Sequence, residues 1–311
     1  MISVVIPLYN AIRYIESLLT QLNEQTQPHE LILIDSSSTD GTPQWLRERN
    51  IPFHSIPTSE FNHGATRNLG VSLATGDYVV MLTQDALPTG PNSLAKLVAP
   101  LQDDESTALA YGRQLPYTDA TPLSVYARQT NYPATSHRKT ANDIRHMGIR
   151  ACHCSNSFAA YRRSALLEIG GFPSDVILGE DVVVGARFVL SGKAIAYVGN
   201  AEVVHSHNYT IAEEFRRYFD IGAFHQQEQK LLGPFLRAES EGIKYVINEW
   251  RYLRQIQRLD LIPDQCIRTI SKYTGYRFGR TQQRLPYWLK QKLSMHKAFW
   301  KKNATKVVED R

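Results

Sequence analysis

Short apolar runs alternate with segments of helical periodicity up to about residue 210. Residues 2–8, 31–35 and 78–82 are nearly continuous apolar runs, a pattern typical of strands that are buried on both faces of a parallel sheet. Between the first two runs, apolar residues recur at helical spacing over residues 12–22, and Asn10 is expected to cap that helix. Strands that alternate with helices in this way predict βαβ crossovers and an α/β fold with a mostly parallel sheet.

Weaker signals predict further elements. They are a helix over 43–49, a weak strand over 52–56, a strand over 107–115, and helices over 163–169 and from residue 180 onward. Two short strands, 194–198 and 201–204, are expected on either side of Gly199 and Asn200, because these residue types favour turns. From residue 211 the spacing is helical, so we place a domain boundary near residue 210.

Residues 116–150 lack a clear apolar period and are expected to be irregular. Long irregular segments in compact domains are usually functional or disordered. Two interpretations stay open, a sugar or phosphate site and a solvated loop. The side chains that would line such a site are Tyr117, Tyr126, Arg128, Asn131, Tyr132 and Arg138.

Composition indicates a globular protein of 311 residues with 42% apolar content. The sequence shows neither an apolar run near 18 residues nor a basic leader with a cleavage site, so no spanning helix or signal peptide is expected. Cys152, Cys154 and Cys266 are too few for a disulfide framework and indicate reduced thiols in a cytosolic protein. We interpret Cys152 and Cys154 as structural, since C-x-C without a second pair is a poor metal site.

The net charge of +5 conceals an uneven distribution. Residues 266–311 contain 12 Lys and Arg against 2 Asp and Glu, whereas residues 1–265 contain 23 against 28. A basic tail attracts polyanions such as nucleic acid or an anionic membrane surface. A last helix expected over residues 285–302 indicates an interfacial membrane helix, or a helix that packs on the body and exposes its lysines. Its apolar face would comprise Leu285, Trp288, Leu289, Leu293 and Trp300.

Four residues at predicted strand or helix ends are candidates for chemistry: Asp35, Asp85, Asp181 and His205. Ligands of open α/β sheets bind outside the carboxyl ends of the strands. Each residue also has a structural interpretation, as a turn cap, a helix-dipole partner or a hydrogen-bonded histidine. The sequence contains neither GxGxxG after the first strand nor a GxxxxGK loop, which disfavours a Rossmann dehydrogenase and a P-loop NTPase.

Five segments carry a resemblance over residues 1–210. They read VVIPLYN, LILIDSSSTDGT, TRNLGVSLATGDYVVMLTQDA, SNSFAAYRRSALLEIGGFP and GEDVVVGARFVLSG. In this order and spacing they resemble the inverting family 2 glycosyltransferases, which have the GT-A fold. The segments FNHGATRN, TQDALP, YGRQLP and HSHNYT are most similar to those of bacterial rhamnosyltransferases, which use dTDP-L-rhamnose to build O-antigens and related surface polysaccharides.

This resemblance implies a domain organisation. A GT-A domain would span 1–210, with a nucleotide-sugar half over about 1–100 and an acceptor half over about 101–210. Residues 211–311 would form a helical, basic C-terminal region that contacts the membrane.

The resemblance also implies roles for single residues. Asp181 matches the catalytic base, and Glu180 is its neighbour near the acceptor. Asp85 matches the last acid of the family's Asp-x-Asp motif and would bind a divalent metal on the donor diphosphate. His205 matches an occasional metal-binding histidine of the family, and His207 is the rival for that role.

The donor site implied by the resemblance lies mostly in the first 85 residues. Asp35 would accept hydrogen bonds from the nucleobase, Pro7 and Tyr9 would line the nucleoside pocket, and Arg67 would lie near the nucleotide. The full set implied for nucleotide-sugar binding is Pro7, Tyr9, Asn10, Asp35, Ser37, Arg67, Gln84 and Asp85.

Glycosyl transfer chemistry fits these residue types. A departing nucleoside diphosphate needs a cation, oxygen ligands suit Mg²⁺ or Mn²⁺, and one imidazole favours Mn²⁺ modestly. A carboxylate must take the proton of the acceptor hydroxyl. Thr83 replaces the first acid of Asp-x-Asp, and a neutral residue there fits a deoxyribose donor such as dTDP. The QxxRW motif of processive synthases is absent after Asp181, so one or a few sugars are expected per encounter.

The function expected is therefore rhamnosyl transfer from dTDP-β-L-rhamnose to a lipid-linked glycan, at the cytoplasmic face of the membrane. Transfer from a UDP-sugar is the alternative within the enzyme class. The alternative from another class is a sugar-nucleotide or polyanion-binding protein without turnover, although nucleic acid is not the expected partner.

Overall fold

The computed structural model describes residues 1–236 and 240–301, which divide into two compact units. The first unit comprises residues 1–120, 127–174 and 180–206, and the second comprises 121–126, 175–179 and the described residues from 207 onward. The sequence placed the boundary near residue 210. It did not predict that the two short segments 121–126 and 175–179 belong to the second unit, because segments of five or six residues carry no periodic signal of their tertiary neighbours.

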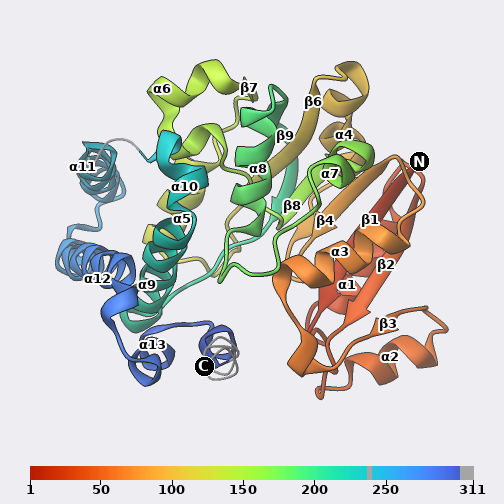
Figure 1. The fold of residues 1–311 in the computed structure, drawn as a ribbon, viewed down its shortest axis with the longest axis horizontal. Coiled ribbons are helices and arrows are strands. Elements are labelled where there is room, and N and C mark those ends of the chain that lie inside the picture. Colours follow the sequence, from red (N-terminus) through yellow and green to blue (C-terminus); the bar gives the residue numbers. More distant parts are fainter. Residues whose placement is uncertain (237–239, 302–311) are drawn as a thin grey trace. The chain divides into compact units, whose positions relative to one another are not determined.

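Within the described residues, nine strands form one sheet in the order β3-β2-β1-β4-β8-β6-β9-β5, with β7 paired to β9 (Figure 1). Parallel pairs join β3, β2, β1 and β4, and also β6 and β9, whereas β8 is antiparallel to β4 and β6. The two parallel groups therefore point the same way, which confirms the predicted α/β fold with a mostly parallel sheet. The strands are β1 (Ile2–Leu8), β2 (His29–Asp35), β3 (His54–Ser55), β4 (Tyr78–Leu82), β5 (Leu87–Pro88), β6 (Thr107–Leu115), β7 (His137–Lys139), β8 (Phe158–Arg162) and β9 (Ala194–Val204).

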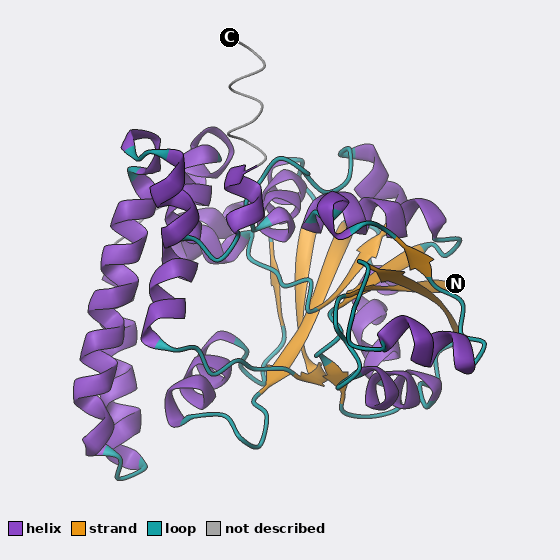
Figure 2. Ribbon diagram, turned by 90° about the horizontal axis from the view of Figure 1, so that it is seen from below, coloured by secondary structure: helices purple, strands orange, loops and turns teal. Residues whose placement is uncertain are grey.

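Helices cover both faces of the sheet (Figure 2). The helices up to residue 190 are α1 (Ile15–Asn23), α2 (Thr42–Glu48), α3 (His63–Leu73), α4 (Ser93–Asp103), α5 (Pro122–Asn131), α6 (Ile144–Met147), α7 (Arg163–Glu168) and α8 (Glu180–Leu190). On one face α1, α2 and α4 share a core with alternate residues of the strands. On the other, α3 approaches β1 so closely that a Cβ at Gly70 would meet the Val5 methyl groups.

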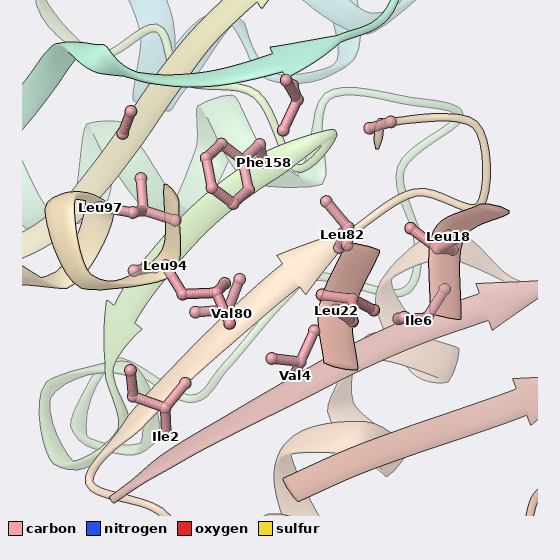
Figure 3. Close-up of a cluster of buried hydrophobic side chains, with 14 of the residues drawn as sticks. Ile2, Val4, Ile6, Leu18, Leu22, Val80, Leu82, Leu94, Leu97 and Phe158 are labelled. Atoms are coloured by element: carbon pink, nitrogen blue, oxygen red, sulfur yellow. The ribbon is translucent and has the colours of Figure 1, made fainter. Parts of the chain in front are cut away.

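The core explains why the apolar runs of the sequence become strands. Alternate residues of β1, Ile2, Val4 and Ile6, point to the face covered by α1 and α4, and the same core contains Leu18 of α1 and Leu97 of α4 (Figure 3). Each fully buried side chain of this size contributes about 1.5–3 kcal/mol to the free energy of unfolding. Burial on both faces fixes the register of the strands and hence the place of the residues that follow them.

Two local predictions are wrong. Asn10 does not cap the first helix, which begins at Ile15 after Tyr14; Asn10 instead has φ +50° in a tight turn. Residues 194–204 form one strand rather than two, because Gly199 and Asn200 lie in a bulge of β9. Gly112 of β6 pairs with Val198, and the next residue, Arg113, pairs with Glu202.

The segment 116–150 is more regular than its sequence predicts, since it contains α5, β7 and α6. Apolar periodicity does not reveal helix α5, because its buried residue is Tyr126 rather than an aliphatic side chain. The Tyr126 ring packs on Tyr245 and Tyr252, with centroid distances of 5.2 Å to each. An aromatic contact of this kind leaves no three- or four-residue repeat in the sequence.

The described part of the second unit is helical, with α9 (Ile211–Gln227), α10 (Gln229–Leu232), α11 (Ser240–Gln255), α12 (Ile262–Arg280) and α13 (Tyr287–Leu293). Helices α9 and α12 pack backbone to backbone, because a Cβ at Gly275 or Gly279 of α12 would overlap the carbonyl oxygens of Phe215 or Phe219. Among the described residues, no helix has both the length and the apolar character needed to span a bilayer.

The single helix predicted over residues 285–302 is not formed. Helix α13 ends at Leu293, and after a break at 294–296 the chain becomes helical again at Lys297. Lys290 is buried, with Nζ 4.7 Å from the Tyr287 ring centroid and 5.1 Å from that of Trp300, whereas Trp288 is 66% exposed. The predicted division into an apolar and a lysine face is therefore wrong for residues 285–301, and residues 302–311 lie outside the described residues.

Candidate active site

The carboxyl ends of β1, β2 and β4 meet at one edge of the sheet, since these strands are parallel neighbours. Strand β8 begins at the same edge, because Phe158 pairs with Leu82 and Thr83 N donates to Ser157 O at 3.3 Å. Strands β6 and β9 also end there, with Leu115 opposite Val204. We call this edge the rim; it gathers residues from across the first unit.

Two turns of the predicted nucleotide site are fastened to each other. Asp35 is 1% exposed and accepts hydrogen bonds from the backbone N–H of Ser38, at 3.0 Å, and from its hydroxyl. Asn10 N donates to Ser38 Oγ at 2.8 Å, and Asn10 Oδ1 accepts from Thr39 N at 2.9 Å. Asn10 and Ser37 both have positive φ, a conformation that costs free energy and persists where the surroundings enforce it.

Gln84 joins β4 to β1. Its Oε1 accepts from Tyr9 N at 2.8 Å, and its Nε2 donates to Tyr9 O at 3.0 Å. Both ends of the amide therefore hold the turn after β1. Tyr9 is 49% exposed in this turn, and Pro7, two residues before it, lies in β1.

Asp85 and His205 face each other on the rim. His205 Nε2 lies 3.5 Å from Asp85 Oδ1. Both residues belong to a group of Asp and His side chains whose potential metal-binding atoms lie within 4.8 Å of one another. The other ring nitrogen, Nδ1, lies 3.0 Å from Gln114 Oε1. A carboxylate oxygen opposite an imidazole nitrogen is a donor set that fits Mn²⁺ or Mg²⁺. His207, the rival histidine, belongs to the second unit and begins its last segment.

Thr83 stands where the family pattern has an acid. Its Oγ1 is buried and has no hydrogen-bond partner among the described residues. Unsatisfied buried hydroxyls are uncommon in proteins. A bound water molecule or a ligand would satisfy this hydroxyl.

A buried ion pair ties α3 to the start of α8. Arg67 NH1 lies 2.8 Å from Glu180 Oε1, and the two side chains are 7% and 8% exposed. Burial is the largest single effect and opposes ionisation of Glu180, but the Arg67 charge, the nearby His63 and the hydrogen bonds to the carboxylate together outweigh it, so the pKa of Glu180 lies below its ordinary value. The sequence placed Arg67 near the nucleotide and Glu180 near the acceptor; in the structure each is buried against the other.

Asp181 is the neighbouring carboxylate and is partly exposed. Its Oδ2 accepts from Asn156 N at 3.2 Å, and its Oδ1 accepts from Val182 N at 2.8 Å. Asn156 directly precedes Ser157, which is hydrogen-bonded to Thr83, so Asp181 belongs to the rim. Burial, and then the nearby Glu180 charge, raise the pKa of Asp181 above the ordinary 3.8 of an aspartate.

Supporting residues explain the motif FNHGATRN. Asn62 caps α3 by accepting from Ala65 N at 3.0 Å, and Arg67 pairs with Glu180. Asn68 holds Phe172 through two hydrogen bonds, of 2.8 and 2.9 Å, to its backbone. The motif thus positions α8 and the turn before it, a role that local sequence pattern did not reveal.

The sequence-predicted residues therefore fall into three groups: the turns with Tyr9, Asn10, Asp35, Ser37 and Gln84, the pair Asp85–His205, and the cluster of Arg67, Glu180 and Asp181. Sequence reasoning missed Asn156 and Gln114, which hold Asp181 and His205. The segments SNSFAAY and YGRQLP, which contain them, were the available signal. Cys154 lies beside this cluster, with its Sγ donating to Asp181 O at 3.2 Å.

Comparison with known proteins gives concordant results. The model of the family "Glycosyl transferase family 2" matches residues 3–170. The chain is 41% identical to the O-antigen chain rhamnosyltransferase WbaN of Salmonella anatum, over 96% of this chain and 95% of the relative. It is 40% identical to the O-antigen chain rhamnosyltransferase RfbN of Salmonella typhimurium, over 96% of each chain.

Solved structures support the fold. The mannosyltransferase PcManGT of Pyrobaculum calidifontis, in complex with GDP-Man and Mn²⁺, aligns with a TM-score of 0.58 at 20% identity, covering 100% of this chain and 87% of that one. Residues 1–349 of TarS from S. aureus, in complex with UDP-GlcNAc, align with a TM-score of 0.53 at 17% identity, covering 91% of each. These matches and the sheet topology establish a GT-A-like fold, and the family match identifies this chain as a member of glycosyltransferase family 2.

Proposed function

We propose that this enzyme transfers L-rhamnose from dTDP-β-L-rhamnose to a hydroxyl of a lipid-linked glycan, with inversion at the anomeric carbon. The observation that carries the inverting chemistry is the presence, on one rim, of a partly exposed carboxylate with a raised pKa and an Asp–His pair. The donor assignment is supported by the two rhamnosyltransferase relatives, which match this chain over nearly its whole length, and by the neutral Thr83.

In this mechanism Asp181 is the base. The acceptor oxygen bonds to the anomeric carbon as the bond from that carbon to the diphosphate oxygen breaks, and the acceptor proton passes to an oxygen of Asp181. The hydrogen bond from Asn156 N holds the carboxylate in place. A divalent metal, held by Asp85 and His205, would stabilise the negative charge that develops on the departing dTDP. The buried carboxylate of Glu180 raises the basicity of Asp181.

We also propose peripheral contact with the anionic inner face of the cytoplasmic membrane, through α11, α12 and the turn between them. Large apolar side chains are exposed throughout residues 243–278, namely Ile243, Ile247, Trp250, Ile256, Leu259, Ile267, Ile270, Tyr273 and Phe278. Exposed basic side chains lie among them: Lys244, Arg251, Arg254, Arg258 and Arg277. This combination favours an interface that is both apolar and anionic. The proposed contact lies upstream of the region 285–302 for which the sequence predicted it.

The donor assignment predicts metal-dependent preference for thymidine nucleotides. In calorimetric titrations with Mn²⁺, dTDP and dTDP-rhamnose should bind more tightly than UDP and UDP-sugars. EDTA or Asp85→Asn should weaken the binding. Tighter binding of a UDP-sugar would refute the donor assignment while leaving the family mechanism intact, and the absence of binding to all nucleotides would refute the proposed function.

The base assignment predicts that Asp181→Asn lowers the transfer rate by about 10²–10⁴-fold, the usual contribution of a general base. Donor affinity should stay unchanged, because the base acts on the acceptor. Asp103→Asn is a matched control, since Asp103 is an exposed carboxylate at the end of α4, near the opposite edge of the sheet. Transfer by Asp181→Asn at the rate of the control would exclude Asp181 as the base.

The raised pKa of Asp181 predicts the pH dependence of transfer. The base must be ionised, so kcat/KM should fall as pH drops through a pKa that is higher than the ordinary 3.8 of an aspartate. Glu180→Gln removes a neighbouring negative charge and should shift this acidic limb to lower pH, whereas Asp103→Asn should not. Profiles are compared within the pH range where thermal unfolding shows each variant folded, since Glu180→Gln also leaves Arg67 without its carboxylate. An unmoved limb would show that another group titrates.

The membrane proposal predicts cosedimentation of the full chain with vesicles that contain anionic phosphatidylglycerol, weaker binding to pure phosphatidylcholine, and release by salt. The double substitution Ile270→Glu and Tyr273→Glu should reduce binding, because it places charge in the apolar surface. Leu190→Glu, at an exposed leucine of α8, is the control. Equal binding by all three proteins would refute this surface.

A further inference from the structure

We propose that Gln114, itself held by Arg128, is a positioning residue that fixes the tautomer of His205, so that the Nε2 lone pair faces Asp85. The inference rests on the proposed metal-assisted function for its purpose, but it concerns the protonation of one side chain in the metal-free protein. None of the resemblances in the sequence singled out Gln114 or Arg128 for this role.

Gln114 lies at the centre of a buried polar network. It is the residue before the last of β6 and is 1% exposed. Its Oε1 lies 2.7 Å from Arg128 NH1 and 3.0 Å from His205 Nδ1, and its Nε2 donates to Ser155 Oγ at 2.9 Å. All of these residues belong to the first unit.

Arg128 determines which end of the amide points to His205. A guanidinium group donates hydrogen bonds and cannot accept them. The Gln114 atom beside it must therefore be the oxygen, which excludes the flipped amide. The Arg128 side chain is itself supported, since its guanidinium carbon lies 5.7 Å from the centroid of the Tyr132 ring.

The orientation of the amide then determines the tautomer of His205. The Gln114 oxygen has no proton to give, so the hydrogen between it and His205 must be on Nδ1. In a neutral imidazole with Nδ1–H, the lone pair is on Nε2, the nitrogen that lies 3.5 Å from Asp85 Oδ1. Two electron-pair donors that face each other at this distance favour a cation between them. Metal-binding histidines usually donate their second N–H to such a partner, and its loss costs 10–100-fold in metal affinity.

The backbone holds the imidazole beside Gln114. Strand β6 pairs Gln114 with Val203 and Leu115 with Val204, and His205 N donates to Leu115 O at 2.8 Å. His205 is thus the first residue beyond the paired part of β9. Its side-chain contact with Gln114 is cross-strand and does not depend on a mobile loop.

The test uses the full chain and two measurements. Long-range ¹H–¹⁵N NMR of the metal-free protein reports which His205 nitrogen is protonated, with assignment by comparison with His205→Asn. Calorimetric titration with Mn²⁺, without sugar nucleotide, reports metal affinity. Two variants break the network: Gln114→Leu removes the acceptor, and Arg128→Met lets the amide flip. Two variants keep it: the carboxylate of Gln114→Glu accepts from both neighbours, and Arg128→Lys retains a donor. Arg138→Met is the matched control, because Arg138 pairs with Asp104 at the amino-terminal end of β6.

We expect Nδ1–H in the unaltered protein, in Gln114→Glu and in Arg128→Lys, which keeps a donor. Gln114→Leu and Arg128→Met should show partial or complete transfer of the proton to Nε2 and a 10–100-fold loss of Mn²⁺ affinity. Arg138→Met should change neither quantity. A merely structural role of Gln114 would not move the tautomer signal in a folded variant.

The inference is overturned if Gln114→Leu and Arg128→Met both keep Nδ1–H and bind Mn²⁺ within twofold of the unaltered protein. If Gln114→Leu does not fold, Arg128→Met and Gln114→Glu decide the outcome alone. If the unaltered protein binds no Mn²⁺, the proposed metal fails, but the tautomer signal still decides whether Gln114 sets the state of His205.

Discussion

The buried ion pair between Arg67 and Glu180 is the interaction on which the candidate active site most depends. It joins two helices that are far apart in the sequence, α3 and α8, at the point where α8 begins. Breaking a buried pair by removal of one partner typically costs 3–5 kcal/mol, because the remaining charge is left without compensation. The pair also keeps Glu180 ionised beside Asp181, so one contact contributes both to the position of the proposed base and to its basicity.

The architecture of the first unit could be predicted to a large extent from the sequence, for a physical reason. Strands such as β1 and β4 are buried on both faces, so nearly every residue must be apolar and the run is visible without any knowledge of its neighbours. Asp35 and Asp85 could be assigned to one edge by the same argument, because parallel strands place their carboxyl ends together. Helix α5 could not be found in this way, since its packing depends on the aromatic ring of Tyr126.

The partners of the site residues could not be predicted, because each pairing depends on three-dimensional register. Nothing near Gln84 in the sequence indicates that its amide is fully used by the backbone of Tyr9, 75 residues away. Arg67 shows the same limit, since nothing in its motif indicates that its guanidinium group pairs with Glu180, which is far away in the sequence. Gln114, which acts on another side chain, lies in the recognisable segment YGRQLP, but nothing in that segment indicates that its partner is His205.

The bulge in β9 has a consequence for how such an enzyme changes over evolutionary time. Three residues, Gly199 to Ala201, are interposed before Glu202 resumes pairing with Arg113, and a Cβ at Gly199 would overlap the carbonyl oxygen of Ala134. Gain or loss of one residue in this strand would move every side chain that follows it to the opposite face of the sheet. Insertions and deletions should therefore be excluded from β9 and should accumulate instead in exposed loops outside the rim. Related enzymes can then differ in loop length while His205 keeps its place at the end of β9.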